Sequence, residues 1–382
     1  MPTDASIPHL PTASPGAWSI PAAELAERLA QGQEITVLDV RLEVDAPIEA
    51  PGATSVHLPA EQVLADPAGT AAGLEGQVAV VCNRGMTARG VAEVLRGQGV
   101  DAAVLEGGMR GWLGVLQARR VEIDVPGLDV IQVQRPGRGC LSYVLAAGGE
   151  VLVVDPAPDA DFYAGLAEGL GARVKYVVDT HIHADHLSGA LSLASRTGAA
   201  LRLPAASLER GVAFASAVEP LADGEEIALG PLSVRTIALP GHTTDMTGFL
   251  VADRALIAGD SVFADGIARP DLQRSDPDGA LKMGRLLHAT LHERLLPLDG
   301  DTVLLPCHTH PGVHPGPIAP RLAEVCAAVP ELAIADPDEF AASLVADMPP
   351  RPANYEAVIA VNSGTHPFDP ELEAGGNSCA TR

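Results

Sequence analysis

The sequence predicts an α/β protein with two domains, a smaller one built on a parallel sheet and a larger one built on mixed sheets. Three observations lead to this prediction. Short apolar strands alternate with helical segments early in the chain, closely spaced strands open the later part, and 382 residues suffice for two or three domains. We place the domains at 18–120 and 125–364, between terminal tails at 1–17 and 365–382.

The first domain is expected to begin with a helix. Pro21 lies in its first turn and Gly32 ends it, which are the usual positions of these residue types. The elements after it alternate, with strands at 35–40, 78–82 and 102–108 and helices at 86–96 and 109–116. Alternation of this kind predicts a parallel sheet with helices on both faces.

The second domain is expected to open with strands joined as hairpins. The predicted strands lie at 131–134, 142–148, 150–156, 174–180, 233–239, 248–253 and 301–306, with a helix at 161–170. This pattern indicates a mixed α/β domain that lies within the usual size range of a single domain.

The composition excludes several classes of function. With 25 Lys and Arg against 49 Asp and Glu, the net charge is −24, which argues against nucleic acid or an anionic membrane as a partner. The hydrophobic fraction of 47% excludes a disordered chain. Five scattered cysteines do not form a disulfide framework, and neither a signal peptide nor an apolar span is visible. We therefore expect a cytoplasmic protein.

Cys82 ends an apolar strand and opens the loop Cys-Asn-Arg-Gly-Met-Thr-Ala, which leads into a predicted helix. A strand–loop–helix corner directs backbone N–H groups and the positive end of the helix dipole into the loop. Together with Arg84, these groups would favour a thiolate and bind a sulfur oxyanion. The alternative is an inert buried cysteine, because free cysteine is often buried.

This loop resembles the active-site loop of rhodaneses. The stretches VLDVR (37–41), PGATSVHLP (51–59) and AAVLEGGMRGW (102–112) are also similar to that family, in the expected order. The resemblance implies that Cys82 carries a persulfide and that Arg84 and the amides around Gly85 bind the anionic sulfur donor.

A second group of chemistry-bearing residues follows another apolar strand. His181, His183, Asp185 and His186 lie within six residues of one another. Such side chains are costly to bury without partners, and imidazoles with a carboxylate are common metal ligands. Three further residues of these types each stand at the end of an apolar run: His242, Asp260 and His308. One sheet edge would bring them all together as a metal site.

The pattern HxHxDH followed by His, Asp and His resembles the metallo-β-lactamase superfamily over about 125–364. The resemblance implies an αββα sandwich with metal at one edge. Finer motifs look like persulfide dioxygenases, namely GCLSYVL (139–145), VDTHIHADHLSG (178–189), LPGHTTD (239–245), GDSVFADGIARPDLQ (259–273) and PPRPANYEAVIAVNSG (349–364).

The dioxygenase resemblance implies one Fe(II) per chain, held by His181, His242 and Asp260, and it implies that Arg269 anchors the anionic persulfide. Four more residues would orient these ligands or, as an alternative, bind a second metal: His183, Asp185, His186 and His308.

We expect an enzyme that oxidises a small thiol persulfide, such as glutathione persulfide, with O₂ to sulfite. Its rhodanese domain would interconvert persulfide and thiosulfate sulfur. The first alternative is a glyoxalase II-like thioester hydrolase with two zinc ions, since ligand types alone do not exclude one. The second alternative makes the first domain a non-catalytic module that binds persulfidated partners. The sequence leaves open the thiol carrier, the direction of sulfur transfer and whether the chain forms a homo-oligomer.

Overall fold

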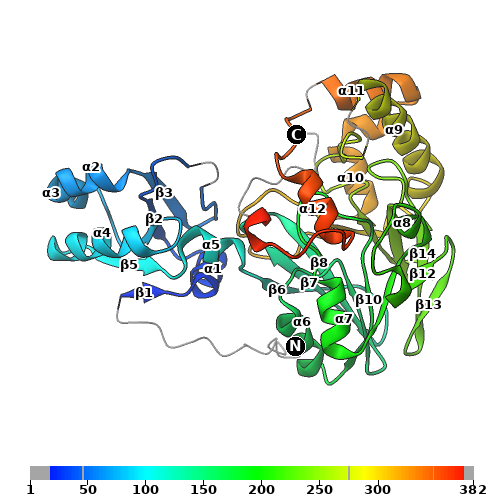
Figure 1. The fold of residues 1–382 in the computed structure, drawn as a ribbon, viewed down its shortest axis with the longest axis horizontal. Coiled ribbons are helices and arrows are strands. Elements are labelled where there is room, and N and C mark those ends of the chain that lie inside the picture. Colours follow the sequence, from blue (N-terminus) through cyan, green and yellow to red (C-terminus); the bar gives the residue numbers. More distant parts are fainter. Residues whose placement is uncertain (1–17, 45–46, 274–275, 347, 374–382) are drawn as a thin grey trace.

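The computed structural model describes residues 18–44, 47–273, 276–346 and 348–373. The predicted N-terminal tail lies outside these residues. Two α/β domains lie next to one another, as Figure 1 shows, with the first in blue and cyan and the second in green to red. The predicted fold class is confirmed.

The first domain has a parallel sheet in which the described strands follow the order β1–β5–β4–β2–β3. The strands are β1 (Ser19–Ile20), β2 (Ile35–Asp39), β3 (Ala53–His57), β4 (Gln77–Val81) and β5 (Asp101–Leu105). The helices are α1 (Ala22–Ala30), α2 (Ala60–Ala65), α3 (Pro67–Ala72), α4 (Met86–Gly97) and α5 (Gly108–Leu113).

Both faces of this sheet are covered, because alternate residues of a strand point to opposite sides. Val37 and Val81 pack with α1 and α5 in one core cluster. Leu38 and Val80 pack with α2 and α4 in another. This packing explains why the predicted strands read as continuous apolar runs, as strands buried on both faces do.

The second domain contains two sheets. The first follows the order β12–β11–β10–β9–β8–β7–β6 and the other β13–β14–β15–β16–β17, among the described residues. The first sheet has β6 (Gln117–Val121), β7 (Leu128–Arg135), β8 (Cys140–Ala147), β9 (Glu150–Val154), β10 (Arg173–Val178), β11 (Ala200–Pro204) and β12 (Val218–Leu221). The second has β13 (Glu226–Leu229), β14 (Leu232–Ala238), β15 (Thr247–Val251), β16 (Ala255–Gly259) and β17 (Val303–Pro306).

These sheets form the inner layers of an αββα sandwich. Tyr143 and Phe249 meet in the core cluster between the sheets. The outer face of the first sheet packs against α6 (Ala160–Gly169) and α7 (Ala190–Thr197), and that of the second against α9 (Pro277–Thr290), α10 (Leu322–Ala328) and α11 (Pro337–Ala346). The remaining helices are α8 (Ala205–Glu209), α12 (Tyr355–Asn362), the 3₁₀ turns Ala215–Ala217, Pro330–Ala333 and Pro370–Glu373, and the π turn Leu291–Leu295.

Strand direction brings the predicted ligands to one edge. The strands β9 and β10 are parallel, whereas β8 is antiparallel to β9, so β8 starts where β10 ends. In the other sheet β14 is antiparallel to β15 and β15 to β16, while β16 is parallel to β17, so β14, β16 and β17 end together. The loops that follow these strand ends carry the predicted metal-ligating histidine and aspartate side chains.

The domains are joined by more than the connecting chain. The strand β6 starts just after α5 and pairs with β7 as the edge of the second domain's sheet. Arg135 donates from Nε to the carbonyl of Leu113 at 2.9 Å. Val313, from the loop after β17, belongs to the first domain's core cluster.

The predicted C-terminal tail at 365–382 lies partly outside the described residues. Its described portion differs from a tail, because Pro370–Glu373 forms a 3₁₀ turn. The buried carboxylate of Glu373 accepts hydrogen bonds from both terminal nitrogens of Arg135, at 2.9 and 2.7 Å. This ion pair holds the segment against the second domain. Separately, no helix in the described ranges has the length and apolar character needed to cross a membrane.

Candidate metal centre and cysteine loop

The Cys82 loop surrounds a buried sulfur with backbone amides. The Cys82 Sγ accepts hydrogen bonds from the N–H groups of Gly85 at 3.1 Å and Ala88 at 3.4 Å. Gly85 has a φ of +83°, a left-handed conformation that glycine adopts readily, and it turns the chain into α4. The Arg84 side chain is exposed beside the loop. An anionic sulfur on Cys82 would face the same amides.

The start of α5 lies directly against this loop. The N–H groups of Met109 and Arg110 donate to the carbonyls of Cys82 and Asn83, at 2.9 and 3.2 Å. A Cβ on Gly108 would lie 2.1 Å from the carbonyl oxygen of Cys82, so only glycine fits there. The helix α5 therefore fixes the backbone that carries the cysteine.

His181, His242 and Asp260 form a compact buried group, which we call the metal triad. The Nε2 atoms of His181 and His242 lie 3.8 and 3.7 Å from Oδ2 of Asp260. These three atoms are buried and lack a hydrogen-bond partner among the described residues. Burying such atoms unsatisfied is costly, so their convergence indicates a site for a cation.

The remaining atom of each triad residue is held by a neighbour. His242 donates from Nδ1 to the carbonyl of Arg269 at 2.8 Å, and His308 Nδ1 lies 2.7 Å from Oδ1 of Asp260. The Thr180 hydroxyl donates to Asp155, so it accepts from Nδ1 of His181, 2.9 Å away. Both triad imidazoles thus direct an unprotonated Nε2 inward, the form that binds metal.

The pKa shifts agree with these protonation states. Burial lowers the pKa of His181 well below its usual value, and the neighbouring His183 lowers it further. Burial also lowers the pKa of His242. Burial by itself would raise the pKa of Asp260, but the charge and hydrogen bond of His308 lower it overall. Neutral imidazoles and an ionised carboxylate are what metal binding requires.

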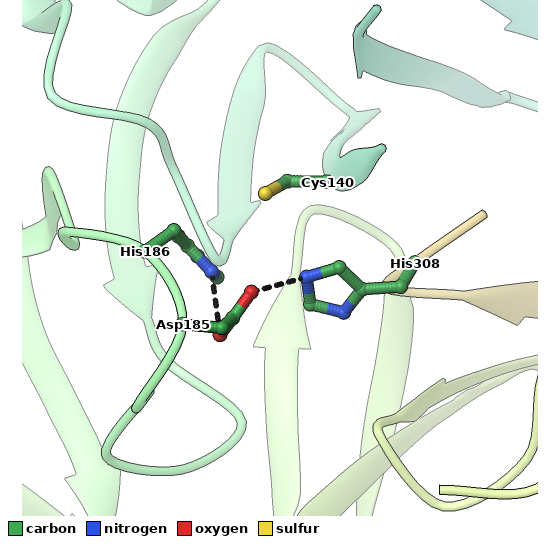
Figure 2. A group of neighbouring side chains, drawn as sticks. All are labelled: Cys140, Asp185, His186 and His308. Carbon is green, nitrogen blue, oxygen red and sulfur yellow. Dashed lines mark hydrogen bonds and ion pairs between the residues drawn. The ribbon is translucent and has the colours of Figure 1, made fainter. Parts of the chain in front are cut away.

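A second buried group contains Cys140, Asp185, His186 and His308, and we call it the Cys140 cluster (Figure 2). Asp185 Oδ1 lies 3.0 Å from Nδ1 of His186, and Asp185 Oδ2 lies 2.7 Å from Nε2 of His308. Burial raises the pKa of the Cys140 thiol, but His186 and His308 outweigh it and lower this pKa to about 5.

The ring centroid of His183 lies 4.2 Å from that of His181 and 4.1 Å from that of His186, and its Nδ1 is buried without a hydrogen-bond partner among the described residues. Its Nε2 lies 3.1 Å from Oδ1 of Asp155, in a separate group with Asp179. Asp155 directly follows β9 with a φ of +52° and also accepts from the backbone N–H of Thr180 at 2.6 Å. Sequence reasoning missed Cys140, which begins β8, and also Asp155 and Asp179, which directly follow β9 and β10.

Arg269 is buried, and its guanidinium binds the carboxylate of Asp271 through two hydrogen bonds of 2.7 and 3.1 Å. It also donates to the carbonyl of Pro349 at 2.7 Å, and Arg351 shares Asp271 at 2.7 Å. Its observed contact with the metal triad is the carbonyl that accepts from His242. The expected role of Arg269 as a substrate anchor stays a prediction.

Comparisons with known proteins define the class. The Metallo-beta-lactamase superfamily profile matches residues 135–308, and the Rhodanese-like domain profile matches residues 21–114. Hydroxyacylglutathione hydrolase from Anaeromyxobacter dehalogenans is 32% identical over 60% of this chain and 82% of that protein. The chain belongs to the metallo-β-lactamase superfamily and carries an N-terminal rhodanese-like domain, as the motifs predicted.

Within this superfamily, the chain is similar to enzymes of two kinds. Human mitochondrial persulfide dioxygenase ETHE1 is 31% identical over 43% of this chain and 60% of that protein. The crystal structure of ETHE1 from Myxococcus xanthus has the same fold, with a TM-score of 0.52 and 24% identity over 62% of this chain and 98% of that one. The chain spans about three fifths of the length of the first curated relatives that it matches.

Proposed function

We propose that this protein oxidises a small thiol persulfide, such as glutathione persulfide, with O₂ and transfers sulfane sulfur through Cys82. The overall oxidation is RSSH + O₂ + H₂O → RSH + SO₃²⁻ + 2H⁺. The observation that carries the proposal is the metal triad, with two imidazole nitrogens and one carboxylate oxygen unpaired and buried together. Non-haem Fe(II) oxygenases use such a set of ligands with open positions for substrates. Similarity to a persulfide dioxygenase supports this choice.

In this proposal His181, His242 and Asp260 hold one Fe(II) per chain. Bound iron would supply the redox chemistry that joins O₂ to sulfur. Thr180, the Arg269 carbonyl and His308 keep the three ligands in position through the hydrogen bonds described above. We also propose that the charged network of Arg269, Asp271 and Arg351 attracts the anionic persulfide, since the chain as a whole is acidic.

The proposed role of Cys82 is nucleophilic. Its thiolate takes the outer sulfur of thiosulfate, Cys82–S⁻ + S–SO₃²⁻ → Cys82–S–S⁻ + SO₃²⁻, and a thiol then accepts that sulfur as RSSH. The amides of Gly85 and Ala88 would stabilise the anionic sulfur, and Arg84 would bind the donor. The reverse direction makes thiosulfate from sulfite. Fusing the two domains raises the effective concentration of the shared intermediate.

The test is the metal content of protein purified without added metal, with oxygen uptake on glutathione persulfide measured on the same sample. We expect about one iron per chain and persulfide-dependent uptake. His242→Ala should lose both, while His366→Ala, at an exposed histidine, should keep both. Iron-containing protein without persulfide-dependent oxygen uptake would contradict the proposal.

A hydrolase is the second candidate, because hydroxyacylglutathione hydrolases match the chain as well as the persulfide dioxygenases do. Two neighbouring groups of metal-ligating side chains would then hold two zinc ions. A metal-activated water would attack a glutathione thioester. Two zinc ions per chain, thioester hydrolysis and no oxygen uptake would favour this candidate.

A further inference from the structure

The loop between β10 and α7, residues 179–189, carries four of the predicted metal-ligating side chains, and we call it the ligand loop. The structure describes all of these residues and shows neither helix nor strand among them. Residues 181–187 are nevertheless buried. Because buried backbone N–H and C=O groups need hydrogen-bond partners, other parts of the chain must hold the backbone of this loop.

Asn362, the last residue of α12, bonds to the ligand loop at three points. Its Nδ2 donates to the carbonyls of His183 and His186, at 2.9 and 2.8 Å, and its Oδ1 accepts from the N–H of Ser188 at 2.9 Å. A primary amide has two N–H donors and a carbonyl acceptor, so it matches these three backbone groups. An aspartate in this position would lack both donors.

The segment that follows α12 also contacts the ligand loop. Oε1 of Glu373 accepts from the N–H of Leu187 at 2.9 Å. Arg138 donates to the carbonyl of Glu373 and also to the carbonyl of Asp185. Together with the bonds from α12, these contacts engage the backbone of every residue in 185–188.

We propose that Asn362 is a positioning residue, which holds the ligand loop in the conformation that binds metal. Its three bonds go to backbone atoms, so it acts through the side chains that this backbone carries. The ring centroids of His183 and His181 lie 4.2 Å apart, so a displaced loop would move a ligand of the metal triad. The superfamily profile matches residues 135–308 and does not include α12. This role of Asn362 is the same for either candidate reaction and does not depend on which metal binds.

The test is hydrogen exchange on the metal-free, full-length chain, followed by titration of the same protein with Co²⁺. We expect Asn362→Ala to exchange the amides of the ligand loop faster than the wild type and to bind Co²⁺ about tenfold more weakly. Asn362→Asp keeps the acceptor for Ser188 and loses both donors, so it should show both effects too.

The matched control is Gln132→Met, at another primary amide that holds backbone. Gln132 donates to the carbonyl of Ile318 at 2.7 Å and accepts from its N–H at 2.9 Å, outside the ligand loop. This variant should lower the free energy of unfolding, because it leaves two backbone groups without these partners. Exchange in the ligand loop and the affinity for Co²⁺ should stay at the wild-type values.

Two results would overturn the proposal. One is wild-type exchange and Co²⁺ affinity in both Asn362 variants. The other is the same pair of changes after Gln132→Met, which would make them a consequence of general destabilisation. If Asn362→Ala does not fold, Asn362→Asp decides, because it keeps one of the three bonds. Failure of the proposed oxidation would appear elsewhere, as a wild-type protein that binds metal and takes up no oxygen.

Discussion

Nδ1 of His308 lies 2.7 Å from Oδ1 of Asp260, and this hydrogen bond joins the metal triad to the Cys140 cluster. It occupies one oxygen of the carboxylate and leaves Oδ2 directed at His181 and His242. It also sets the ring of His308 so that Nε2 faces Asp185. A single imidazole thus orients ligand atoms on both sides of itself.

The hydroxyl of Thr180 supports the triad, and its removal should weaken metal binding. Thr180→Val deletes the acceptor for Nδ1 of His181 and should lower the affinity for Fe(II) about 10- to 100-fold. Titration of the metal-free protein measures this. The matched control is Thr243→Val, since the buried hydroxyl of Thr243 has no hydrogen-bond partner among the described residues. Equal affinities for the two variants would show that Thr180 does not position His181.

Cys82→Ser should separate the two proposed activities. The hydroxyl is a poor sulfur nucleophile, so transfer of sulfur from thiosulfate to a thiol should fall to background. Oxygen uptake on added glutathione persulfide should stay near the wild-type rate, because the triad is untouched. Cys326→Ser, at an exposed cysteine on α10, should change neither rate. Unchanged sulfur transfer in Cys82→Ser would remove Cys82 from the mechanism.

Gly108→Ala should displace the cysteine loop. The new Cβ would lie 2.1 Å from the Cys82 carbonyl, at a φ of +59°. We expect slower sulfur transfer and a loss of about 2 kcal/mol in the free energy of unfolding. Gly76→Ala is the control that separates backbone strain from the steric clash. Gly76 has a φ of +67°, but no atom lies within 4 Å of the new Cβ. It should lose about 1 kcal/mol and transfer sulfur normally. Thermal or denaturant unfolding and a thiosulfate assay measure both effects.

The buried pair of Glu373 and Arg135 should contribute to stability in a pH-dependent way. Burial raises the pKa of Glu373, but Arg135 lowers it overall, so the carboxylate has a lower pKa folded than unfolded. Its contribution is present above the unfolded pKa, about 4.3, and is lost as the pH falls through the folded value. Glu373→Gln should therefore cost about 3 kcal/mol near pH 7 and less in acid.

Denaturant unfolding at several pH values measures this difference. The matched control is Glu371→Gln, because the carboxylate of Glu371 is half-exposed and pairs with an exposed Arg110. It should cost less than about 1 kcal/mol at any pH. A cost for Glu373→Gln that is independent of pH would mean that the ion pair does not account for the stability.

The sequence was most informative where strands end. Apolar runs followed by His181, His242 and Asp260 predicted that these side chains would share an edge, and the structure brings them within reach of one metal ion. The parallel sheet of the first domain could likewise be predicted, because strands such as 78–82 are apolar on both faces. Local periodicity and strand direction suffice for inferences of this kind.

Other features depend on contacts between distant segments, which spacing does not encode. Cys140 and His308 are 168 positions apart and meet because β8 begins beside the end of β17. His183 is oriented through Nε2 by Asp155, which lies 28 positions earlier and whose backbone conformation is unusual for a residue other than glycine. The guanidinium of Arg269 likewise donates to the carbonyl of Pro349, 80 positions later in the chain.

Val313 shows that the boundary between the two domains in space differs from their boundary in the sequence. It follows His308 in the second domain, yet its side chain packs among the first domain's core residues, and its N–H donates to the carbonyl of Glu49 at 2.9 Å. A fragment cut between α5 and β7 would leave the first domain with a hole where this residue belongs. The two halves are therefore expected to melt as one cooperative unit, and a different first domain would have to accommodate the side chain of Val313 in its core.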